Sequence, residues 1–245
     1  MPRFFVSPSQ ITDSVVTITG EDAHHISRSL RMRVGESLTV CDGAGTDFDC
    51  VIGSFTSDTV TLTVRSSMPS AGEAPYRAAV YQSLVRGEKF DTVIQKSVEY
   101  GASRIVPVIT SRAEVKLSPA DAEKKRVRWQ RIAAEAAKQC GRGVVPEVAP
   151  AETFAEAVAS APGLKLFCYE NEHTVHLRDA LADAAADGDV SEVSIFVGPE
   201  GGYSEAEAEA AEAALCRVIS LGRRILRTES AAPFVLAALS FAWEK

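Results

Sequence analysis

The spacing of apolar residues along the chain changes near residue 70. In the earlier part, short runs alternate between apolar and polar residues, as in Thr59–Val64 (TVTLTV), and Asp42–Gly45 (DGAG) separates two such runs. Alternation with a period of two predicts β-strands, and the Asp-Gly turn between two of them predicts a hairpin. One helix is expected at Asp22–Arg31. Several short strands with little helix favour a small β-barrel over residues 1–70.

A second pattern begins after Ser66–Tyr76 (SSMPSAGEAPY), a stretch rich in serine, proline and glycine that predicts a linker. Beyond it, apolar runs of strand length alternate with helical stretches, which predicts a mostly parallel sheet with helices on both faces at residues 76–245. The expected strands are Ala78–Ser83, Ile105–Ile109, Lys165–Tyr169, Val193–Val197 and Arg217–Leu221. The expected helices are Lys89–Tyr100, Pro119–Gly141, Thr153–Ser160, Thr174–Ala186, Ser204–Leu215 and Ser230–Trp243.

Composition limits the class of protein. The 245 residues carry a net charge of −7 and are 46% apolar, which is ordinary for a soluble globular protein. The longest apolar stretch, Pro233–Trp243, is too short to span a bilayer, and the first residues contain no secretion signal. The five cysteines are widely spaced, and Cys168, His173 and His176 lack a fourth metal ligand. We therefore expect a cytoplasmic protein with reduced cysteines, no membrane segment and no metal.

The turn Gly198–Gly202 (GPEGG) joins an expected strand to an expected helix, which begins at a capping box formed by Ser204 and Glu207. Open α/β folds bind ligands at such turns, on the carboxyl edge of the sheet. The glycine spacing is not that of a dinucleotide loop, and the lysine of a phosphate-binding P-loop is missing. Because Glu200 would repel phosphate, a neutral or cationic ligand is favoured. A tight turn without a ligand remains an equal alternative.

A second turn of this kind lies in Ser220–Phe234 (SLGRRILRTESAAPF). It places a glycine and several arginines before a helix, so the two turns could form opposite walls of one pocket. In the alternative interpretation the arginines are solvated and Thr228 or Ser230 is a simple helix cap. That alternative fits Arg227 and Glu229 less well, because apolar residues precede them and a helix follows.

Positive charge is concentrated in one helix, although the net charge argues weakly against a nucleic acid partner. Helical spacing places on one face Lys124, Arg128, Arg131, Glu135, Lys138 and Arg142. The opposite face then carries Trp129, Ile132, Ala133, Ala136 and Cys140. Like charges so close together suggest a surface that binds phosphates, with an ordinary charged face as the alternative. Arg28, Arg31 and Arg33 form a second basic group in the first domain.

Taken together, these motifs resemble those of the RsmE family. The resemblance rests on Gly198-Pro199-Glu200-Gly201-Gly202 followed by Leu221-Gly222-x-x-Ile225-Leu226-Arg227-Thr228-Glu229. Weaker similarity extends over nearly the whole chain, through Arg3-Phe4, His24-His25, Leu30-Arg31, Asp42-Gly43, Gln95-Lys96, Glu99, Gly101, Arg128-Trp129, Glu135-Ala136 and Gln139-x-x-Arg142. The departures are modest: Ser230 replaces a more usual threonine, and Tyr100 and Ala102 replace a leucine and a valine.

The resemblance implies an S-adenosylmethionine-dependent enzyme that methylates atom N3 of one uridine, uridine 1498, in 16S ribosomal RNA. It implies a PUA-like barrel followed by a SPOUT-type domain with a deep trefoil knot, and a homodimer that acts on RNA of the small ribosomal subunit. Another SPOUT-class RNA methyltransferase with a different target nucleotide, or an RNA-binding module without enzymatic activity, are the alternatives.

The resemblance also suggests roles for individual residues. For the methyl transfer we expect Arg227 to stabilise the developing uracil anion and Glu229 to accept the N3 proton. The residues expected to bind the cofactor are Val197, Gly198, Glu200, Gly202, Leu221, Gly222, Ile225, Leu226 and Thr228. Glu200 either favours the positively charged sulfonium or simply braces its loop. The expected RNA contacts are Arg28, Arg31, Arg33, Arg128, Arg131 and Arg142.

Overall fold

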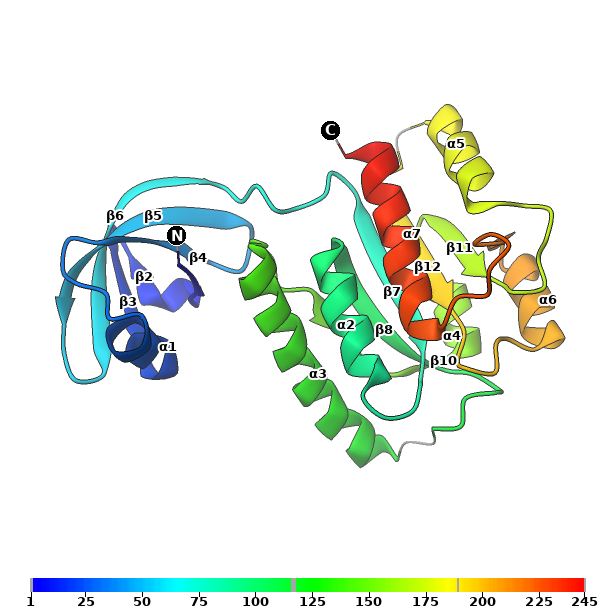
Figure 1. The fold of residues 1–245 in the computed structure, drawn as a ribbon, viewed down its shortest axis with the longest axis horizontal. Helices are drawn as coiled ribbons and strands as arrows, with labels where there is room; N and C mark the ends of the chain where they lie inside the picture. The colour runs from blue at the N-terminus through cyan, green and yellow to red at the C-terminus, as the bar shows by residue number, and fades with distance from the viewer. Residues whose placement is uncertain (1, 116–117, 189, 245) are drawn as a thin grey trace. The chain divides into compact units, whose positions relative to one another are not determined.

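The computed structural model describes residues 2–115, 118–188 and 190–244, and its chain divides into two compact units (Figure 1). The first unit comprises Met1–Glu73 with Ala137–Val145, and the second comprises Ala74–Ala136 with Pro146–Lys245. In the part of the chain that the structure describes, no helix is long and apolar enough to cross a membrane.

The first unit is built on a six-stranded sheet with the strand order β1-β4-β5-β6-β3-β2. Its strands are β1 (Arg3–Phe5), β2 (Ile11–Thr12), β3 (Val15–Thr19), β4 (Ser37–Cys41), β5 (Thr46–Phe55) and β6 (Thr59–Pro69). β1 and β4 are parallel and the other pairs are antiparallel, so the predicted hairpin between β4 and β5 is confirmed. The predicted helix is α1 (Gly20–His24) continued by the π-helical turn η2 (His25–Ser29), and a short 3-10 turn, η1, covers Pro8–Gln10.

The predicted linker is shorter than its composition suggested. Ser66–Pro69 continue β6 and pair with β5, in a register that ends with Pro69 opposite Thr46. Cross-strand pairing therefore outweighs the local preference of serine and proline for irregular structure, and Pro69 is tolerated because it is the last residue of its strand.

The second unit is built on a seven-stranded sheet in which every pair of strands is parallel. The order is β10-β8-β7-β12-β11-β13, with β9 beside β8. The strands are β7 (Arg77–Ser83), β8 (Ala102–Ile109), β9 (Glu147–Val148), β10 (Glu152–Thr153), β11 (Leu164–Cys168), β12 (Glu192–Val197) and β13 (Arg217–Ile219). The helices are α2 (Lys89–Glu99), α3 (Pro119–Cys140), α4 (Phe154–Ser160), α5 (Leu177–Asp187), α6 (Glu205–Ala213) and α7 (Thr228–Trp243).

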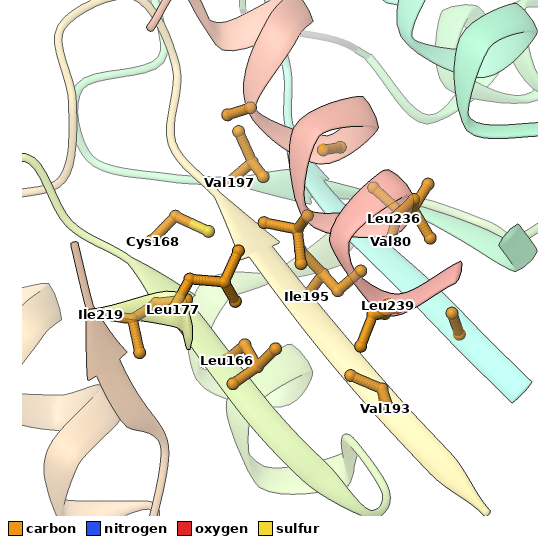
Figure 2. Packing of buried hydrophobic residues seen from close by; sticks show 14 of the residues in the cluster. Val80, Leu166, Cys168, Leu177, Val193, Ile195, Val197, Ile219, Leu236 and Leu239 are labelled. Atoms are coloured by element: carbon orange, nitrogen blue, oxygen red, sulfur yellow. The ribbon is translucent and has the colours of Figure 1, made fainter. Parts of the chain in front are cut away.

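Both faces of this sheet are covered, as the strand patterns predicted. On one face, Val80, Ile195 and neighbouring strand residues pack against Leu236 and Leu239 of α7 (Figure 2). The residues in between, such as Tyr81, point to the other face and pack in a cluster that includes α4 and α6. Strands that are apolar on both sides are typical of a parallel sheet buried between helices.

The basic helix α3 largely follows its predicted faces. Trp129 is buried and its ring lies 4.3 Å from that of Phe90 in α2, whereas Lys124, Arg128 and Arg131 are exposed. The prediction is wrong for Arg142, because α3 ends at Cys140 and Gly141 then adopts a φ of +80°. The chain turns away from the helical path, so helical spacing no longer decides where Arg142 points.

Arg142 is buried in the first unit rather than presented to RNA. Its side chain is 4% exposed, and its Nη2 donates to Oε2 of Glu73 at 2.5 Å. The Glu73 carboxylate also accepts hydrogen bonds from the backbone N–H groups of Gly143 and Val144. This ion pair therefore anchors residues 137–145 to the first unit, and Arg142 is not available as an RNA contact.

We expect Arg142→Ala to lower the free energy of unfolding by about 2–3 kcal/mol, because it leaves Glu73 without its charged partner in a partly buried position. Arg142→Lys should restore little of this loss, since an ammonium group cannot reproduce the planar guanidinium contacts. Urea unfolding followed by circular dichroism measures the effect, with the exposed Arg131→Ala as the control. Equal stability of the Arg142→Ala and Arg131→Ala variants would contradict this role.

Candidate functional site

Strands β7, β11, β12 and β13 end at the same edge of the parallel sheet, and the loops after β11, β12 and β13 surround a cavity of about 590 Å³. This volume is in the range of sites for small molecules and cofactors. The cavity is lined by Lys89, Cys168, Tyr169, Glu170, Val197–Gly202, Ser220–Gly222, Arg224–Glu229 and Ala231. The two glycine-bearing turns are therefore walls of one cavity, as the sequence suggested.

The turn after β12 has two glycines in confined positions. A Cβ atom on Gly198 would lie 3.2 Å from the ring of the buried Tyr203 and 3.3 Å from the carbonyl carbon of Gly202. Gly202 has a φ of +65°, and a Cβ there would collide with the carboxylate of Glu170. These glycines allow backbone and side chains from neighbouring loops to approach more closely than other residues would permit.

The turn after β13 is joined to the turn after β12 by a side chain. The Thr228 hydroxyl donates to the carbonyl oxygen of Gly198 at 2.6 Å, and Nε2 of Gln82 donates to the Thr228 hydroxyl oxygen at 2.9 Å. Helix α7 begins at Thr228 with Arg227 as its N-cap, so the alternative in which Thr228 or Ser230 caps the helix is wrong. Thr228 instead connects the two walls of the cavity.

Glu200 is held by an ion pair at the rim of the cavity. Its carboxylate accepts hydrogen bonds from Nζ of Lys89 at 2.8 Å and from the backbone N–H of Arg86 at 3.3 Å. Burial would raise the pKa of Glu200, but the hydrogen bond from Lys89, backbone hydrogen bonds and the Lys89 charge outweigh it and hold the pKa below its ordinary value. Since Lys89 balances its charge, the geometry favours the loop-bracing role.

Arg227 and Glu229 both line the cavity but differ in exposure. The Arg227 side chain is 85% exposed, and the Glu229 side chain is 20% exposed. Nη1 of Arg227 lies 3.9 Å from Oε1 of Glu229, which is within ion-pair distance. Oε2 of Glu229 is buried and has no hydrogen-bond partner among the described residues. A carboxylate oxygen without such a partner, beside an exposed cation, can accept a proton or a hydrogen bond from a ligand.

The nine residues predicted to bind a cofactor all line this cavity: Val197, Gly198, Glu200, Gly202, Leu221, Gly222, Ile225, Leu226 and Thr228. Sequence reasoning missed Lys89, Tyr169 and Glu170, which come from a helix start and a loop without a motif. Cys168 also lines the wall, and burial raises the pKa of its thiol to about 12, so it remains a neutral thiol.

The predicted RNA contacts other than Arg142 are on the surface of their units. Arg28, Arg31 and Arg33 are exposed at and after η2, and Arg31 has a φ of +53°. Arg131 is exposed on α3. Arg128 is also exposed, but its guanidinium donates two hydrogen bonds to the carboxylate of Asp91 in α2.

Comparison with known proteins identifies the family to which the chain is similar. Residues 72–240 match the sequence model of an RNA methyltransferase domain, and residues 18–65 match that of an RNA methyltransferase PUA domain. The chain is 33% identical to the ribosomal RNA small subunit methyltransferase E of Bacillus subtilis (strain 168), over 100% of this chain and 98% of that protein. It is 31% identical to the protein of the same name from Synechocystis, and that match covers 97% of this chain and 77% of the Synechocystis protein.

A solved structure gives the same result. The crystal structure of a ribosomal RNA small subunit methyltransferase E from Neisseria gonorrhoeae, bound to S-adenosyl methionine, superposes with a TM-score of 0.85. That protein is 31% identical, and the match covers 99% of this chain and 98% of the other. The two turns, the cavity between them and these full-length similarities agree: the chain belongs to the RsmE family of ribosomal RNA small subunit methyltransferases.

Proposed function

We propose that this protein methylates atom N3 of a uridine in 16S ribosomal RNA, uridine 1498 by family resemblance, with S-adenosylmethionine as the methyl donor. The observation that carries the proposal is that one cavity is lined by all nine predicted cofactor residues together with Arg227 and Glu229, whose Oε2 has no hydrogen-bond partner in the described parts of the chain. The names of the relatives and the S-adenosyl methionine in the Neisseria gonorrhoeae structure support the coarser part of the proposal, a methyltransferase of small-subunit ribosomal RNA that uses this cofactor.

The cavity fits the cofactor in size and in chemistry. Gly198 and Gly202 leave backbone groups accessible at one wall, and Leu221, Ile225 and Leu226 contribute apolar surface at the other. A nucleoside needs this combination of polar backbone groups and apolar contact area. When bound, S-adenosylmethionine supplies a methyl group on positively charged sulfur, which is already electrophilic. The remaining task of the protein is to prepare the uracil nitrogen.

The side chains at the cavity can perform that task. Uracil N3 carries a proton at neutral pH and becomes nucleophilic when the proton leaves, so a general base near N3 accelerates transfer by about 10²–10⁴-fold. In the proposed mechanism Oε2 of Glu229 accepts this proton, because it is buried in the cavity wall and lacks a partner among the described residues. Arg227, whose exposed side chain can reach an incoming base, stabilises the negative charge on the uracil oxygens.

We infer that the path between β13 and α7 forms the trefoil knot of a SPOUT domain. β13 is at the edge of the sheet, whereas α7 packs on β12, β7 and α2. Backbone hydrogen bonds join Ser220 to Val175 in the loop after β11 and to Leu177, the first residue of α5. Thr228 then bonds to Gly198 in the loop after β12. Closure of the first sheet into a PUA-like barrel is part of the same proposal. An experimental electron-density map that traces residues 169–228 without threading would refute the knot.

We propose that RNA phosphates contact Arg28, Arg31 and Arg33 in the first unit and Arg128 and Arg131 on α3. The exposed arginines are suited to bidentate phosphate contacts. Replacing one of them with alanine should weaken RNA binding and make the dependence of affinity on salt concentration less steep. An unchanged salt dependence would show that the replaced arginine does not contact RNA phosphates.

A homodimer is the expected assembly. Phe234 and Phe241 of α7 are seven residues apart, so they share one face of the helix, and they are 44% and 94% exposed. An apolar stripe of this kind is costly to leave in water, and a second copy of the chain would cover it. Light scattering measures the mass of the particle, and a mass equal to one chain would contradict this proposal.

One assay tests the function as a whole. Small ribosomal subunits that lack the modification are incubated with the protein and S-adenosylmethionine carrying a radiolabelled methyl group. We expect label at N3 of a single uridine, located by primer extension and nucleoside analysis. Label on another nucleotide would mean a different RNA methyltransferase, and no label on either subunits or naked 16S RNA would argue against an enzyme.

Gly198→Val should abolish cofactor binding and methyl transfer, because its side chain would displace Tyr203 or the Gly202 backbone and narrow the cavity. Calorimetry with S-adenosylmethionine and a gel-shift assay with 16S RNA separate the two activities. RNA binding should survive, since the exposed arginines are unchanged. If the native protein binds RNA but neither binds the cofactor nor transfers methyl groups, the binding-module alternative is favoured.

Arg227→Ala should reduce the rate of methyl transfer by about 10²–10³-fold, because it removes the cation proposed to stabilise the uracil anion. The neighbouring Arg223→Ala is the matched control: Arg223 is exposed on the same loop but does not line the cavity. The measurement is the single-turnover rate at saturating cofactor and RNA. Equal rates for the two variants would remove Arg227 from the mechanism.

A further inference from the structure

Gln82 is a buried polar residue behind the cofactor cavity. It is the penultimate residue of β7 (Arg77–Ser83), in a run whose other central residues are apolar, and its side chain is fully buried. Gln82 does not line the cavity; it contacts Gly198 and Thr228, which do. Any effect of Gln82 on the cavity is therefore transmitted through these two residues.

The hydrogen bonds around Gln82 determine which way its amide points. The Thr228 hydroxyl has one hydrogen, and it donates that hydrogen to the Gly198 carbonyl at 2.6 Å. The hydroxyl can then only accept from Gln82, so the amide nitrogen must face it, at 2.9 Å. The other hydrogen of the same nitrogen is directed toward the carbonyl oxygens of Ser83 at 3.2 Å and Gly198 at 3.4 Å.

This arrangement has a cost that an apolar residue would avoid. The carbonyl oxygen Oε1 of Gln82 is buried and has no hydrogen-bond partner within the described parts of the chain. Leaving buried polar atoms unsatisfied destabilises a fold, whereas an apolar side chain of similar size in β7 would bury no orphaned amide oxygen. The amide is therefore better explained by what its nitrogen holds than by stability.

We propose that Gln82 is a positioning residue for the cofactor: its amide fixes Thr228 and Gly198, and thereby the separation of the two walls of the cavity. Gly198 follows β12 and Thr228 begins α7, so the two residues belong to elements that do not share a strand ladder at this point. Gln82, near the end of the neighbouring strand β7, contacts both residues at once. This inference rests on the proposed function, because it concerns the affinity of the same cavity for S-adenosylmethionine.

The test uses Gln82→Met in the full chain, since methionine has a similar length and volume but no amide. We expect the dissociation constant for S-adenosylmethionine, measured by calorimetry, to rise by about tenfold, as expected for the loss of buried hydrogen bonds. The KM for the cofactor should rise to a similar extent, and the KM for RNA should remain unchanged. A purely structural role would change the melting temperature without changing either cofactor constant.

Gln130→Met is the matched control. Gln130 in α3 also joins two backbone groups, donating to the Pro146 carbonyl at 3.0 Å and accepting from the Val148 N–H at 2.8 Å, and it does not line the cavity. This variant should lower the melting temperature and leave cofactor affinity unchanged. If both methionine variants lose affinity equally, the effect is general destabilisation and the positioning role is refuted.

Thr228 allows a second test from the other side of the contact. Thr228→Val removes the hydroxyl and should weaken cofactor binding, whereas Thr228→Ser keeps the hydroxyl and should restore it. The double variant with Gln82→Met should bind no more weakly than Thr228→Val alone, because both changes break one network. Additive losses, or native affinity in Gln82→Met, would overturn the positioning role. Failure of the native protein to bind S-adenosylmethionine would instead overturn the proposed function, and this inference with it.

Discussion

The cavity depends on how the chain returns from the edge of a parallel sheet to its middle. β13 lies beside β11 at the edge, but the helix that follows, α7, packs on β12 and β7. The connecting segment must cross the carboxyl ends of the strands, and the hydrogen bond from Thr228 to Gly198 holds the end of that crossing against the turn after β12. Because both turns are held at this point, the space between them keeps the size of a small-molecule site.

The sequence predicted the parts of this arrangement that carry a repeated or local signal. In β7, Val80 is buried on one face of the sheet and Tyr81 on the other. Because both faces are buried, the strand is a continuous apolar run, and this run predicted a buried strand. The nine residues predicted to bind a cofactor could be grouped because two glycine motifs mark them, and all nine line the one cavity. Glu170 and Gln82 were missed because each is a single polar residue outside any motif, and only the fold brings Glu170 close to Gly202 and Gln82 close to Thr228. Arg142 was misassigned because the left-handed Gly141 ends the periodicity on which the prediction relied.

The burial of each ion pair decides which arginines can serve an RNA partner. Surface pairs contribute only about 0–1 kcal/mol, so Arg128 can exchange Asp91 for a phosphate at little cost. The pair of Arg142 and Glu73 is different, because the arginine is buried and the carboxylate also holds the backbone of Gly143 and Val144. An excess of acidic residues in the whole chain is thus compatible with local surfaces that bind phosphate.

The same reasoning explains the contrast between Arg227 and Glu229, under the proposed mechanism. Arg227 is the N-cap of α7 and its side chain is mostly exposed, whereas Glu229 in the first helical turn is mostly buried, and its Oε2 has no hydrogen-bond partner among the residues that the structure describes. A buried acceptor without a partner is unfavourable until a donor arrives. The N3–H group of an incoming uracil would be such a donor, and the Arg227 side chain, 85% exposed, is accessible to the same base. Substrate binding would then satisfy the carboxylate and bring the cation to the base in one step, which couples proton removal to the presence of the correct nucleotide.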